Sequence, residues 1–358
     1  MKYRVLVINP GSTSTKIAAY EGQETFFAKT LRHSVEELLP YKKVCDQYPF
    51  REKVILDALA QADVSLSSFN AIIGRGGLIK PIPSGVYKVN ALMMEHLEQG
   101  FTGEHASNLG GLLAARLAAK ISPDCPAFIA DPVVVDEMED VARLTGIPAI
   151  KRLSVWHALN QKAVAKNHAR TVGIPYEQLN LIGIHLGGGI SVAPHCHGRV
   201  IDVNNALDDE GPIAPERAGS IPALQLAKLC FSGNYTYDQV RRMLNGGGGM
   251  VALLGTNSFM EVSQRVADKD PEATRVYNAM AYSIAKQIGA AAVSLKGKVD
   301  GIFFTGGIAH DKDFVNLIIS QVSFLGPCFV YPGEDEMGAL AQNAQSVLSG
   351  QEAAKLYE

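Results

Sequence analysis

The sequence predicts an α/β protein built from two duplicated domains, each with a mixed sheet flanked by helices on both faces. Three observations lead to this fold class. The chain has 358 residues, more than a single hydrophobic core usually organises. A strand, a glycine-rich turn and a second strand occur near the N-terminus and again near residue 180. Helical patterns lie between and after these two hairpins, as they do in a duplicated α/β unit.

The first hairpin is expected in RVLVINPGSTSTKIAAYEG, residues 4–22. Its β-branched run ends at the turn residues Asn9-Pro10-Gly11. Thr15, Ile17 and Ala19 then alternate with Ser14, Lys16 and Ala18, as on the two faces of a second strand. A Walker loop or a Rossmann turn would instead open a helix. Glycine and hydroxyl groups in this turn suit phosphate oxygens, although an ordinary hairpin turn would use similar residues.

The second hairpin is expected in LNLIGIHLGGGISVAPHCHGRVIDV, residues 179–203, with a further turn at His197-Gly198 into a third strand. A strand followed by a glycine turn occurs once more in VDGIFFTGGIAHD, residues 299–311. Three such turns in one chain favour phosphate binding over the ordinary turn. Helical patterns cover residues 103–120, 159–169, 238–244 and 270–295.

The domain boundary is expected near residues 144–160, where Gly146, Pro148 and a basic pair interrupt the pattern. We therefore expect one domain of residues 1–152 with 337–358 and a second of residues 153–336. Since the phosphate turns lie at strand ends, the active site is expected in the inter-domain cleft.

The composition excludes several classes of protein. The net charge is −3, and the 33 lysines and arginines are scattered, so nucleic acid is not an expected partner. The apolar run from Val5 to Ile8 is too short for a signal peptide, and no apolar stretch has the length of a membrane span. The five cysteines are widely spaced with no CxxC pair, which favours reduced thiols in the cytoplasm.

Motifs along nearly the whole chain resemble the acetate and butyrate kinase family, a branch of the actin-like and sugar-kinase ATPase superfamily, and the butyrate kinase branch of it more closely. They are INPGSTSTK, GRGGLIKPIPSGVY, GEHASNLGG, DPVVVDEMEDVARLTG, WHALNQK, HLGGGISV, RVIDVNNALDDEGPIAPERAG, FTGGIAH and YPGEDEM. The resemblance implies two ribonuclease-H-like domains. It also implies ATP-dependent phosphorylation of a short-chain fatty acid to an acyl phosphate, and the reverse reaction. The enzyme would be a phosphotransferase with a carboxyl acceptor, using ATP/ADP and Mg²⁺ and assembling as a homodimer or larger oligomer.

This chemistry requires cations rather than a strong base. A carboxylic acid with a pKa of about 4–5 is already ionised at neutral pH, and the obstacle is the approach of one anion to another. Arg75, in IIGRGGL, and Arg217, in PERAGSIP, lie in loops bounded by Gly or Pro. Taken alone, either would be an ordinary surface arginine. The resemblance implies that both are catalytic and grip the substrate carboxylate and the transferring phosphoryl group.

The resemblance adds three further residues to the site. It implies that His157, in SVWHALNQ, donates a hydrogen bond to a phosphoryl oxygen, and that Asp131 orients the acid or the arginines. It also matches His105, in GEHASNLGG, to a second pocket histidine. Without the resemblance, His157 would be a capping or core histidine beside Trp156, and His105 a neighbour of a helix N-cap.

The remaining matches concern the nucleotide and the metal. By resemblance, the residues expected to bind the nucleotide are Ser12, Ser14, Lys16, His185, Gly187, Gly188, Gly189, Thr305, Gly306 and Gly307. Magnesium would be held largely through water and phosphate oxygens, with Asn9 and Glu336 as the partners and Asp335 as the alternative acid.

Several interpretations stay open. His195 and His197 could form a zinc pair, although a hairpin rim is favoured because no ligand cluster follows. Ser258 and Met260 occupy positions where the family commonly has Asp and Arg. Either the nucleotide is bound more weakly, or Glu261 or Arg265 substitutes. The apolar segment 277–295 could be an oligomer interface or core.

Two questions about function also stay open. A nucleotide-driven binding protein of the actin or chaperone kind would share the phosphate hairpins and would need no substrate arginines. The acid itself is uncertain, because acetate, propionate and butyrate differ by methylenes worth only about 0.8 kcal/mol each, and isobutyrate differs from butyrate only in branching. The physiological direction of the reaction is equally open.

Overall fold

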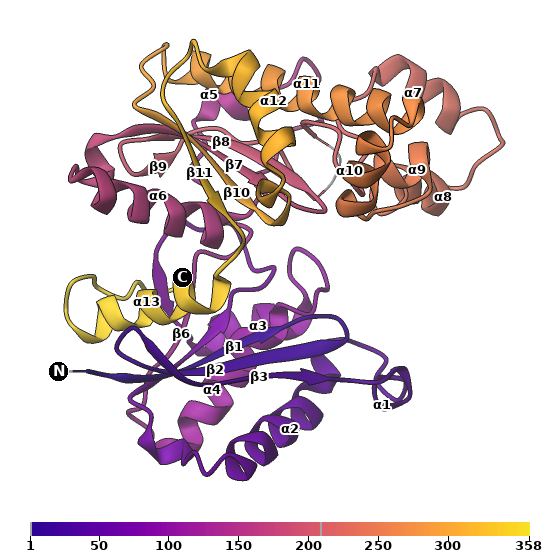
Figure 1. The fold of residues 1–358 in the computed structure, drawn as a ribbon. Coiled ribbons are helices and arrows are strands. Elements are labelled where there is room, and N and C mark those ends of the chain that lie inside the picture. The colour runs from indigo at the N-terminus through magenta and orange to yellow at the C-terminus, as the bar shows by residue number, and fades with distance from the viewer. Residues whose placement is uncertain (1, 208–209) are drawn as a thin grey trace. The chain divides into compact units, whose positions relative to one another are not determined.

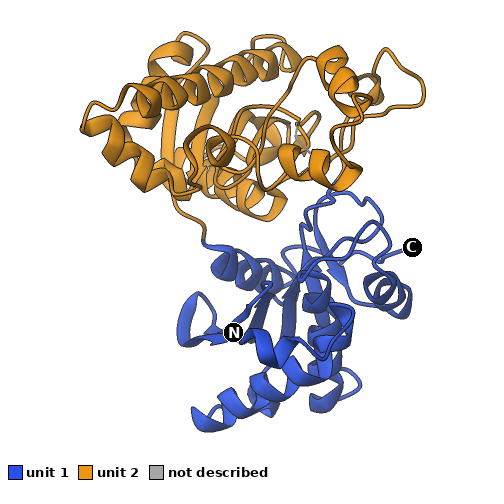
Figure 2. Cartoon of the chain, turned by 90° about the vertical axis from the view of Figure 1, so that its right-hand side faces the viewer, with its two compact units in different colours: residues 1–135, 335–358 blue, residues 136–334 orange. Residues whose placement is uncertain are grey.

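The computed structural model describes residues 2–207 and 210–358. The chain forms two compact units, residues 1–135 with 335–358 (unit 1) and residues 136–334 (unit 2), as Figure 2 shows. The sequence places the corresponding boundaries after residues 152 and 336.

Unit 1 contains a six-stranded mixed sheet in the order β3-β2-β1-β4-β6-β5 (Figure 1). Its strands are β1 Arg4–Pro10, β2 Ser14–Glu21, β3 Glu24–Arg32, β4 Ala71–Arg75, β5 Val86–Lys88 and β6 Ala127–Ala130. The first three strands are antiparallel, β4 and β6 continue the sheet parallel to β1, and β5 adds an antiparallel edge. The predicted first hairpin is therefore confirmed, and no helix follows its turn.

Unit 2 contains a five-stranded mixed sheet in the order β11-β10-β7-β8-β9. Its strands are β7 Asn180–Leu186, β8 Ile190–Cys196, β9 Arg199–Val200, β10 Gly301–Gly306 and β11 Cys328–Pro332. Read from β9, this order repeats that of unit 1 from β3, with three antiparallel strands followed by two parallel ones. This shared topology confirms the duplication predicted from the sequence.

The four predicted helical segments correspond to α4, α6, α8 and α11, except that α4 begins at Asn108 instead of residue 103. Unit 1 has α1 Val35–Leu38, α2 Tyr48–Gln61, α3 Ala91–Gln99, α4 Asn108–Ile121 and α13 Glu336–Leu348, with the 3₁₀ turns η1 Cys45–Gln47 and η2 Leu66–Ser68. Unit 2 has α5 Asp140–Arg143, α6 Ala158–Val172, α7 Ala223–Cys230, α8 Tyr237–Leu244, α9 Met250–Leu254, α10 Phe259–Ala267, α11 Pro271–Ser294 and α12 Lys312–Val322, with η3 Tyr176–Gln178 and η4 Gly307–His310.

A close helix–sheet contact fixes the end of β4 in unit 1. A Cβ on Gly74 would lie 2.0 Å from the carbonyl oxygen of Gly110 on α4, and a Cβ on Gly110 would lie 2.2 Å from the carbonyl oxygen of Arg75. The helix can approach β4 this closely only because both positions are glycine. The last residue of β4, Arg75, is thus held against the first turn of α4.

Helix α11 provides much of the core of unit 2. Its buried side chains include Met280, Ile284 and Ile288, which belong to the same apolar cluster as Ile184 of β7 and Phe304 of β10. Of the two interpretations of segment 277–295, core packing therefore accounts for its apolar face.

All five cysteines are free thiols. Among the described residues, none of the helices combines the length and the apolar character needed to cross a bilayer.

Candidate functional site

Three of the predicted residues of unit 1 meet at one carboxylate. Asn9 lies in β1, Arg75 ends β4, and Glu336 begins α13. The Asn9 Nδ2 donates to Glu336 Oε2 at 2.7 Å, and the Arg75 guanidinium contacts both Glu336 oxygens, at 3.2 Å from Nη1 and 3.1 Å from Nη2. The carboxylate thus holds the arginine in a bidentate geometry and ties the first hairpin strand to the end of β4.

The neighbouring acid, Asp335, has a different function. It is the N-cap of α13, and its Oδ1 accepts from the backbone N–H of Gly338 at 2.8 Å. The cap satisfies one of the unbonded N–H groups at the start of the helix and so positions Glu336 in its first turn. Of the two acids considered for the metal, Glu336 is the one that contacts Asn9.

Asp131 follows β6 in a strained conformation. Its φ is 39°, in the left-handed region that residues other than glycine rarely adopt, and Pro132 follows it. The buried carboxylate accepts from the Ser84 hydroxyl at 2.7 Å and from the Gly85 N–H at 2.8 Å. These bonds fasten residues 84–85 beside the end of β6, so Asp131 organises a loop of unit 1.

His105 lies in the turn before α4. Its Nδ1 is 2.9 Å from the Ser107 hydroxyl and accepts from the Ser107 N–H at 3.2 Å. Partial burial, together with the positive charge of Arg75, lowers the pKa of His105. The electrostatic influence of Arg75 connects His105 with the Arg75 cluster, while its hydrogen bonds belong to the local turn.

The turn of the first hairpin rests on an arginine that the sequence analysis did not identify. Arg51, fully buried on α2, donates from Nη1 to the carbonyls of Gly11 (2.8 Å) and Ser14 (3.0 Å), and from Nη2 to that of Ser12 (3.1 Å). Burial lowers the pKa of Arg51 to about 10, so it stays charged at neutral pH. Its cation engages carbonyls that would otherwise repel a bound phosphate.

Arg51 was missed for a clear reason. In the sequence it stands in YPFREK, where a charge on a helical pattern indicates a solvated face. Ser12 and Lys16, by contrast, are exposed on the hairpin, as expected of groups that contact a ligand.

Two histidines stack in unit 2. The rings of His157 and His185 lie face to face, with centroids 3.8 Å apart and planes 10° apart. His185 is buried on β7, with Nδ1 2.9 Å from Asn160 Oδ1 and Nε2 3.1 Å from Glu334 Oε1. His157 precedes α6, but its ring makes no capping bond and instead contacts the Ser191 hydroxyl at 2.9 Å.

The glycines of unit 2 meet different constraints. A Cβ on Gly189 would lie 2.7 Å from the Ala206 carbonyl oxygen, and one on Gly306, where φ is 90°, would lie 2.3 Å from that of Leu186. Thr305 is buried and donates its hydroxyl to the Gly333 carbonyl at 3.1 Å. Thr305 and Gly306 therefore shape the loop, whereas Gly187, Gly188 and Gly307 line a cavity.

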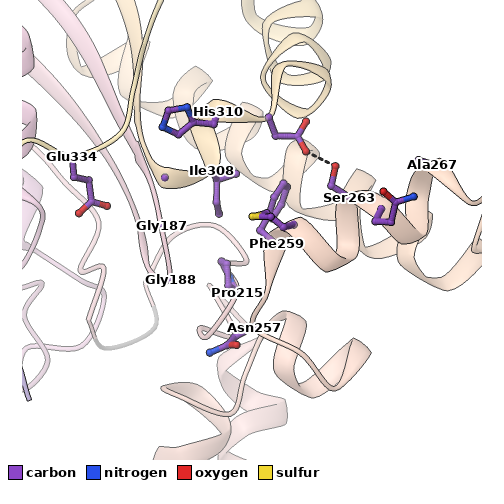
Figure 3. A pocket seen from close by; sticks show the side chains of 14 residues that line it. Gly187, Gly188, Pro215, Asn257, Phe259, Ser263, Ala267, Ile308, His310 and Glu334 are labelled. Carbon is purple, nitrogen blue, oxygen red and sulfur yellow. Dashed lines mark hydrogen bonds between the residues drawn. The ribbon is translucent and has the colours of Figure 1, made fainter. Parts of the chain in front are cut away.

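This cavity, of about 800 Å³, lies wholly within unit 2 (Figure 3). Its lining residues come from the β7–β8 turn, the loop between β9 and α7, α10 and the residues before it, η4 and Asp311, and the segment after β11. They are Gly187, Gly188, Pro215, Asn257, Phe259, Met260, Ser263, Gln264, Ala267, Gly307, Ile308, His310, Asp311 and Glu334. Figure 3 shows apolar Phe259, Pro215 and Ile308 together with polar Asn257, His310 and Glu334 around it. A mostly apolar wall with a few polar groups is typical of a small-molecule site.

Neither candidate substitute for the family's usual charged pair reaches this cavity. Glu261 accepts from the Thr256 hydroxyl at 2.7 Å, and Arg265 pairs with Asp270 at 2.7 Å. Ser258 is the N-cap of α10, and Met260 lies on the cavity wall. Met260, at the position where the resemblance leads us to expect an arginine, therefore presents an uncharged side chain to the cavity.

Arg217 is held in its loop by carbonyl groups. Its Nε donates to the Leu207 carbonyl and its Nη1 to that of Glu216, both at 3.1 Å, and the Glu216 carboxylate is 3.7 Å from Nη1. The Glu216 N–H in turn donates to the Gly188 carbonyl at 3.1 Å. This contact joins the Arg217 loop to the glycine turn of the second hairpin.

The two histidines of the HCH segment do not form a metal pair. His195 is fully buried against Tyr176 and Gln161, while His197 lies in the hairpin turn with φ of 49°. A hairpin rim describes His197 correctly but is wrong for His195. Among the described residues, no group of three or more His, Cys, Asp or Glu side chains is arranged to hold a metal.

The sequence can be compared with known proteins. The profile of the acetokinase family matches residues 148–355. Butyrate kinase 2 of Clostridium acetobutylicum is 51% identical over 358 residues, the whole of both chains. The chain belongs to the acetokinase family. Butyrate kinase 1 of the same organism is also 51% identical, over 99% of this chain and all of its own length.

A solved member of the family has the same fold. The acetate kinase of Porphyromonas gingivalis superposes with a TM-score of 0.81 over 97% of this chain and all of its own, at 18% identity. The acetate-kinase-like fold expected from the sequence, with two mixed α/β sheets, is therefore confirmed.

Proposed function

We propose that this chain transfers the γ-phosphoryl group of ATP directly to butyrate, forming butyryl phosphate and ADP, and catalyses the reverse reaction at the same site. The observation that carries the proposal is the 51% identity to two butyrate kinases over essentially the whole chain. The arrangement of charges within each unit agrees with this chemistry.

In unit 1, Arg75 would grip the carboxylate of the acid. Its contact with both oxygens of Glu336 demonstrates a fork geometry that suits a carboxylate or a phosphoryl group, and Asn9 steadies the same cluster. Ser12, Ser14 and Lys16 would bind phosphate oxygens from the hairpin behind which Arg51 is buried. Asp131 would orient the loop at residues 84–85, and His105 would line the pocket that binds the carboxylic acid.

In unit 2, the cavity would take the nucleoside of ATP. Its volume of about 800 Å³ lies within the usual range for ligand sites, about 300–1,000 Å³. The glycines 187–189 and 306–307 would allow the backbone to approach the phosphates. Arg217 and His157 would then stabilise charge on the transferring phosphoryl group.

Magnesium would be held by Asn9 and Glu336 largely through water. Their amide and carboxylate oxygens are the donors that Mg²⁺ prefers, and both Glu336 oxygens already accept hydrogen bonds, which fits a partner reached through water. When bound, Mg²⁺ would neutralise charge on the phosphate chain. Asn9 and Arg75 meanwhile keep the Glu336 carboxylate in place.

Hydroxylamine trapping tests the reaction itself. With ATP and butyrate, the wild-type protein should form butyryl hydroxamate, and Arg75→Ala should lose at least about 100-fold of kcat/KM, as expected for loss of a charge that stabilises the transition state. Arg116→Gln is the matched control, because Arg116 of the same unit pairs with Glu52 outside the cluster. A wild-type protein that binds ATP and forms no hydroxamate would favour the actin-like or chaperone-like alternative.

The choice of acid needs a separate assay. ADP release with acetate, propionate, butyrate and isobutyrate should give the highest kcat/KM with butyrate. Differences of about three- to fourfold per methylene are expected from about 0.8 kcal/mol of burial each. A higher value for isobutyrate would assign the chain to branched acids instead.

We further propose that the protein is cytoplasmic and forms a homo-oligomer. Sedimentation at several protein concentrations checks the oligomeric state.

A further inference from the structure

Behind His157 in unit 2 lies a buried row of hydrogen bonds that no part of the reaction scheme above uses. It runs from Tyr176 through His195, Gln161 and Ser191 to His157. The distances are 2.7 Å from Tyr176 Oη to His195 Nδ1, 3.2 Å from His195 Nε2 to Gln161 Oε1, 2.8 Å from Gln161 Nε2 to Ser191 Oγ, and 2.9 Å from Ser191 Oγ to His157 Nδ1.

We propose that this row, the Tyr176–His157 relay, fixes the tautomer of His157, so that Nδ1 accepts from Ser191 and Nε2 carries the proton. Gln161, Ser191, His195 and Tyr176 are then positioning residues for the histidine. Their effect on catalysis rests on the proposed function, because only that function gives His157 a phosphoryl oxygen to contact. The tautomer itself does not depend on the substrate.

The direction of the relay follows from one backbone group. The Gln161 Nε2 donates to the main-chain carbonyl of Ser191 at 3.2 Å as well as to its hydroxyl. A carbonyl oxygen can only accept, so the amide nitrogen must face Ser191 and the amide oxygen must face His195. This contact fixes the orientation of an amide that would otherwise be ambiguous.

The direction of each remaining bond then follows. Since Gln161 Oε1 can only accept, His195 Nε2 must donate to it, and the other nitrogen of a neutral His195 accepts from the Tyr176 hydroxyl. Burial, and then the nearby charge of Lys162, lower the pKa of His195 well below its usual range, which keeps the ring neutral.

At the other end, the Ser191 oxygen accepts from Gln161, so its proton is available to His157 Nδ1. A neutral histidine whose Nδ1 accepts carries its proton on Nε2. This is the tautomer that can donate to a phosphoryl oxygen through Nε2.

The surroundings of the relay bury its side chains and hold them in one arrangement. Gln161, Ser191 and His195 are fully buried. The His195 ring packs edge to face against Trp156 and Phe303. In such surroundings a polar group without a partner is costly, so the bonds stabilise one another as a set.

Gly183 of β7 provides the space for the bond between Gln161 and His195. A Cβ there would lie 2.3 Å from Gln161 Oε1 and 2.8 Å from His195 Nε2. Glycine is therefore the one residue type at position 183 that leaves Gln161 Oε1 and His195 Nε2 in place. His195, the first histidine of the HCH segment, is thus assigned a positioning role in the relay that involves no metal.

The test uses Gln161→Glu, which has nearly the shape of the wild type, reverses the bond to the Ser191 hydroxyl and removes the bond to the Ser191 carbonyl. An accepting oxygen would replace the amide N–H, so the Ser191 hydroxyl would turn toward residue 161 and His157 would have to donate from Nδ1. Long-range ¹H–¹⁵N correlation spectra of protein labelled on histidine separate protonated from bare ring nitrogens. A His157→Gln spectrum identifies the signals of His157.

In the wild type we expect a bare Nδ1 and a protonated Nε2 on His157, and in Gln161→Glu a protonated Nδ1. A protonated Nδ1 in the wild-type protein, or a bare Nδ1 in folded Gln161→Glu, overturns the proposal. If Gln161→Glu does not fold, the wild-type spectrum still decides the tautomer. The spectra need no turnover, so failure of the kinase function would not be mistaken for failure of the relay.

Kinetics test the positioning role. Ser191→Ala should lower kcat about tenfold with little change in the KM values, and Ser191→Thr, which keeps the hydroxyl, should restore most of it. Tyr176→Phe should lower kcat about two- to tenfold, the usual range for loss of one buried hydrogen bond. The matched control is Tyr331→Phe, which removes a 2.8 Å bond to His168 outside the relay. Equal losses in Tyr176→Phe and Tyr331→Phe would contradict a positioning role for Tyr176.

Discussion

At the scale of single residues, the carboxylate of Glu336 does more than its position in the sequence indicates. It accepts from Asn9 and pairs with both nitrogens of the Arg75 fork. The adjacent Asp335 carboxylate instead caps α13. Two neighbouring acids therefore have separate functions, and variants of each can be compared.

We predict that Glu336→Gln lowers kcat about 10- to 100-fold and raises the Mg²⁺ concentration needed for half-maximal velocity, because an amide neither pairs with Arg75 nor attracts the cation. Asp335→Asn should change both quantities less than twofold, since Asn caps a helix about as well as Asp. Mg²⁺ titrations of the initial velocity provide the measurement. A shift with Asp335→Asn alone would assign the metal to Asp335.

Residues proposed to contact the substrates were easier to find from the sequence than the residues behind them. Arg75 and Arg217 stand in motifs bounded by glycine or proline, and His157 stands in the WHALNQK motif. Arg51 and Gln161 stand inside helices, where a polar residue reads as part of a solvated face. Their burial becomes evident only once the opposite segment has packed against them.

At the scale of elements, two glycines set the distance between α4 and β4. A Cβ at Gly110 would overlap the backbone of Arg75, whereas the nearest atoms to a Cβ at Gly289, within α11, lie beyond 4 Å. The same substitution is therefore expected to have opposite effects in the two helices.

Gly110→Ala should destabilise the protein by about 1–3 kcal/mol through overpacking and should lower kcat/KM by displacing Arg75. Gly289→Ala, the matched control, should stabilise it by about 0.5–1 kcal/mol, because alanine favours an open helical site. Urea unfolding and hydroxamate kinetics on both variants provide the measurements. A Gly110→Ala variant with wild-type stability and activity would show that α4 can move without disturbing Arg75.

The hairpins were the most predictable elements. In both units a β-branched strand ends in a glycine turn and returns as an antiparallel strand. The short α1, α5 and α9 and the edge strand β5 carry little periodic signal, being three to five residues long. Their conformation depends on the neighbours they pack against.

At the scale of the whole molecule, buried histidines link stability to pH. Burial is the largest cause lowering the pKa of His33, His168 and His195. Below about pH 6.5 the unfolded chain therefore binds protons at these positions more readily than the native protein does. The unfolded state therefore binds more protons, and the free energy of unfolding rises with pH in this range.

We predict that stability falls as the pH is lowered from 7 to 5, with each buried histidine contributing at most about 1.4 kcal/mol per pH unit. His168→Gln should make this dependence shallower. Urea unfolding followed at pH 7.5, 6.5 and 5.5 gives the slopes. Stability that is constant or rises toward pH 5 would mean that these histidines are protonated in the native state.

The sequence by itself determined the two-fold α/β repeat, the hairpins that replace a Walker loop and the family. These features follow from strand alternation, turn residues and motifs, all of which are local in the chain. Only the tertiary structure decided which acid meets Asn9, 327 residues away, and which buried groups lie behind the first hairpin and His157. Such contacts arise because burying a polar or charged group requires a partner, and packing alone determines which distant residue supplies it.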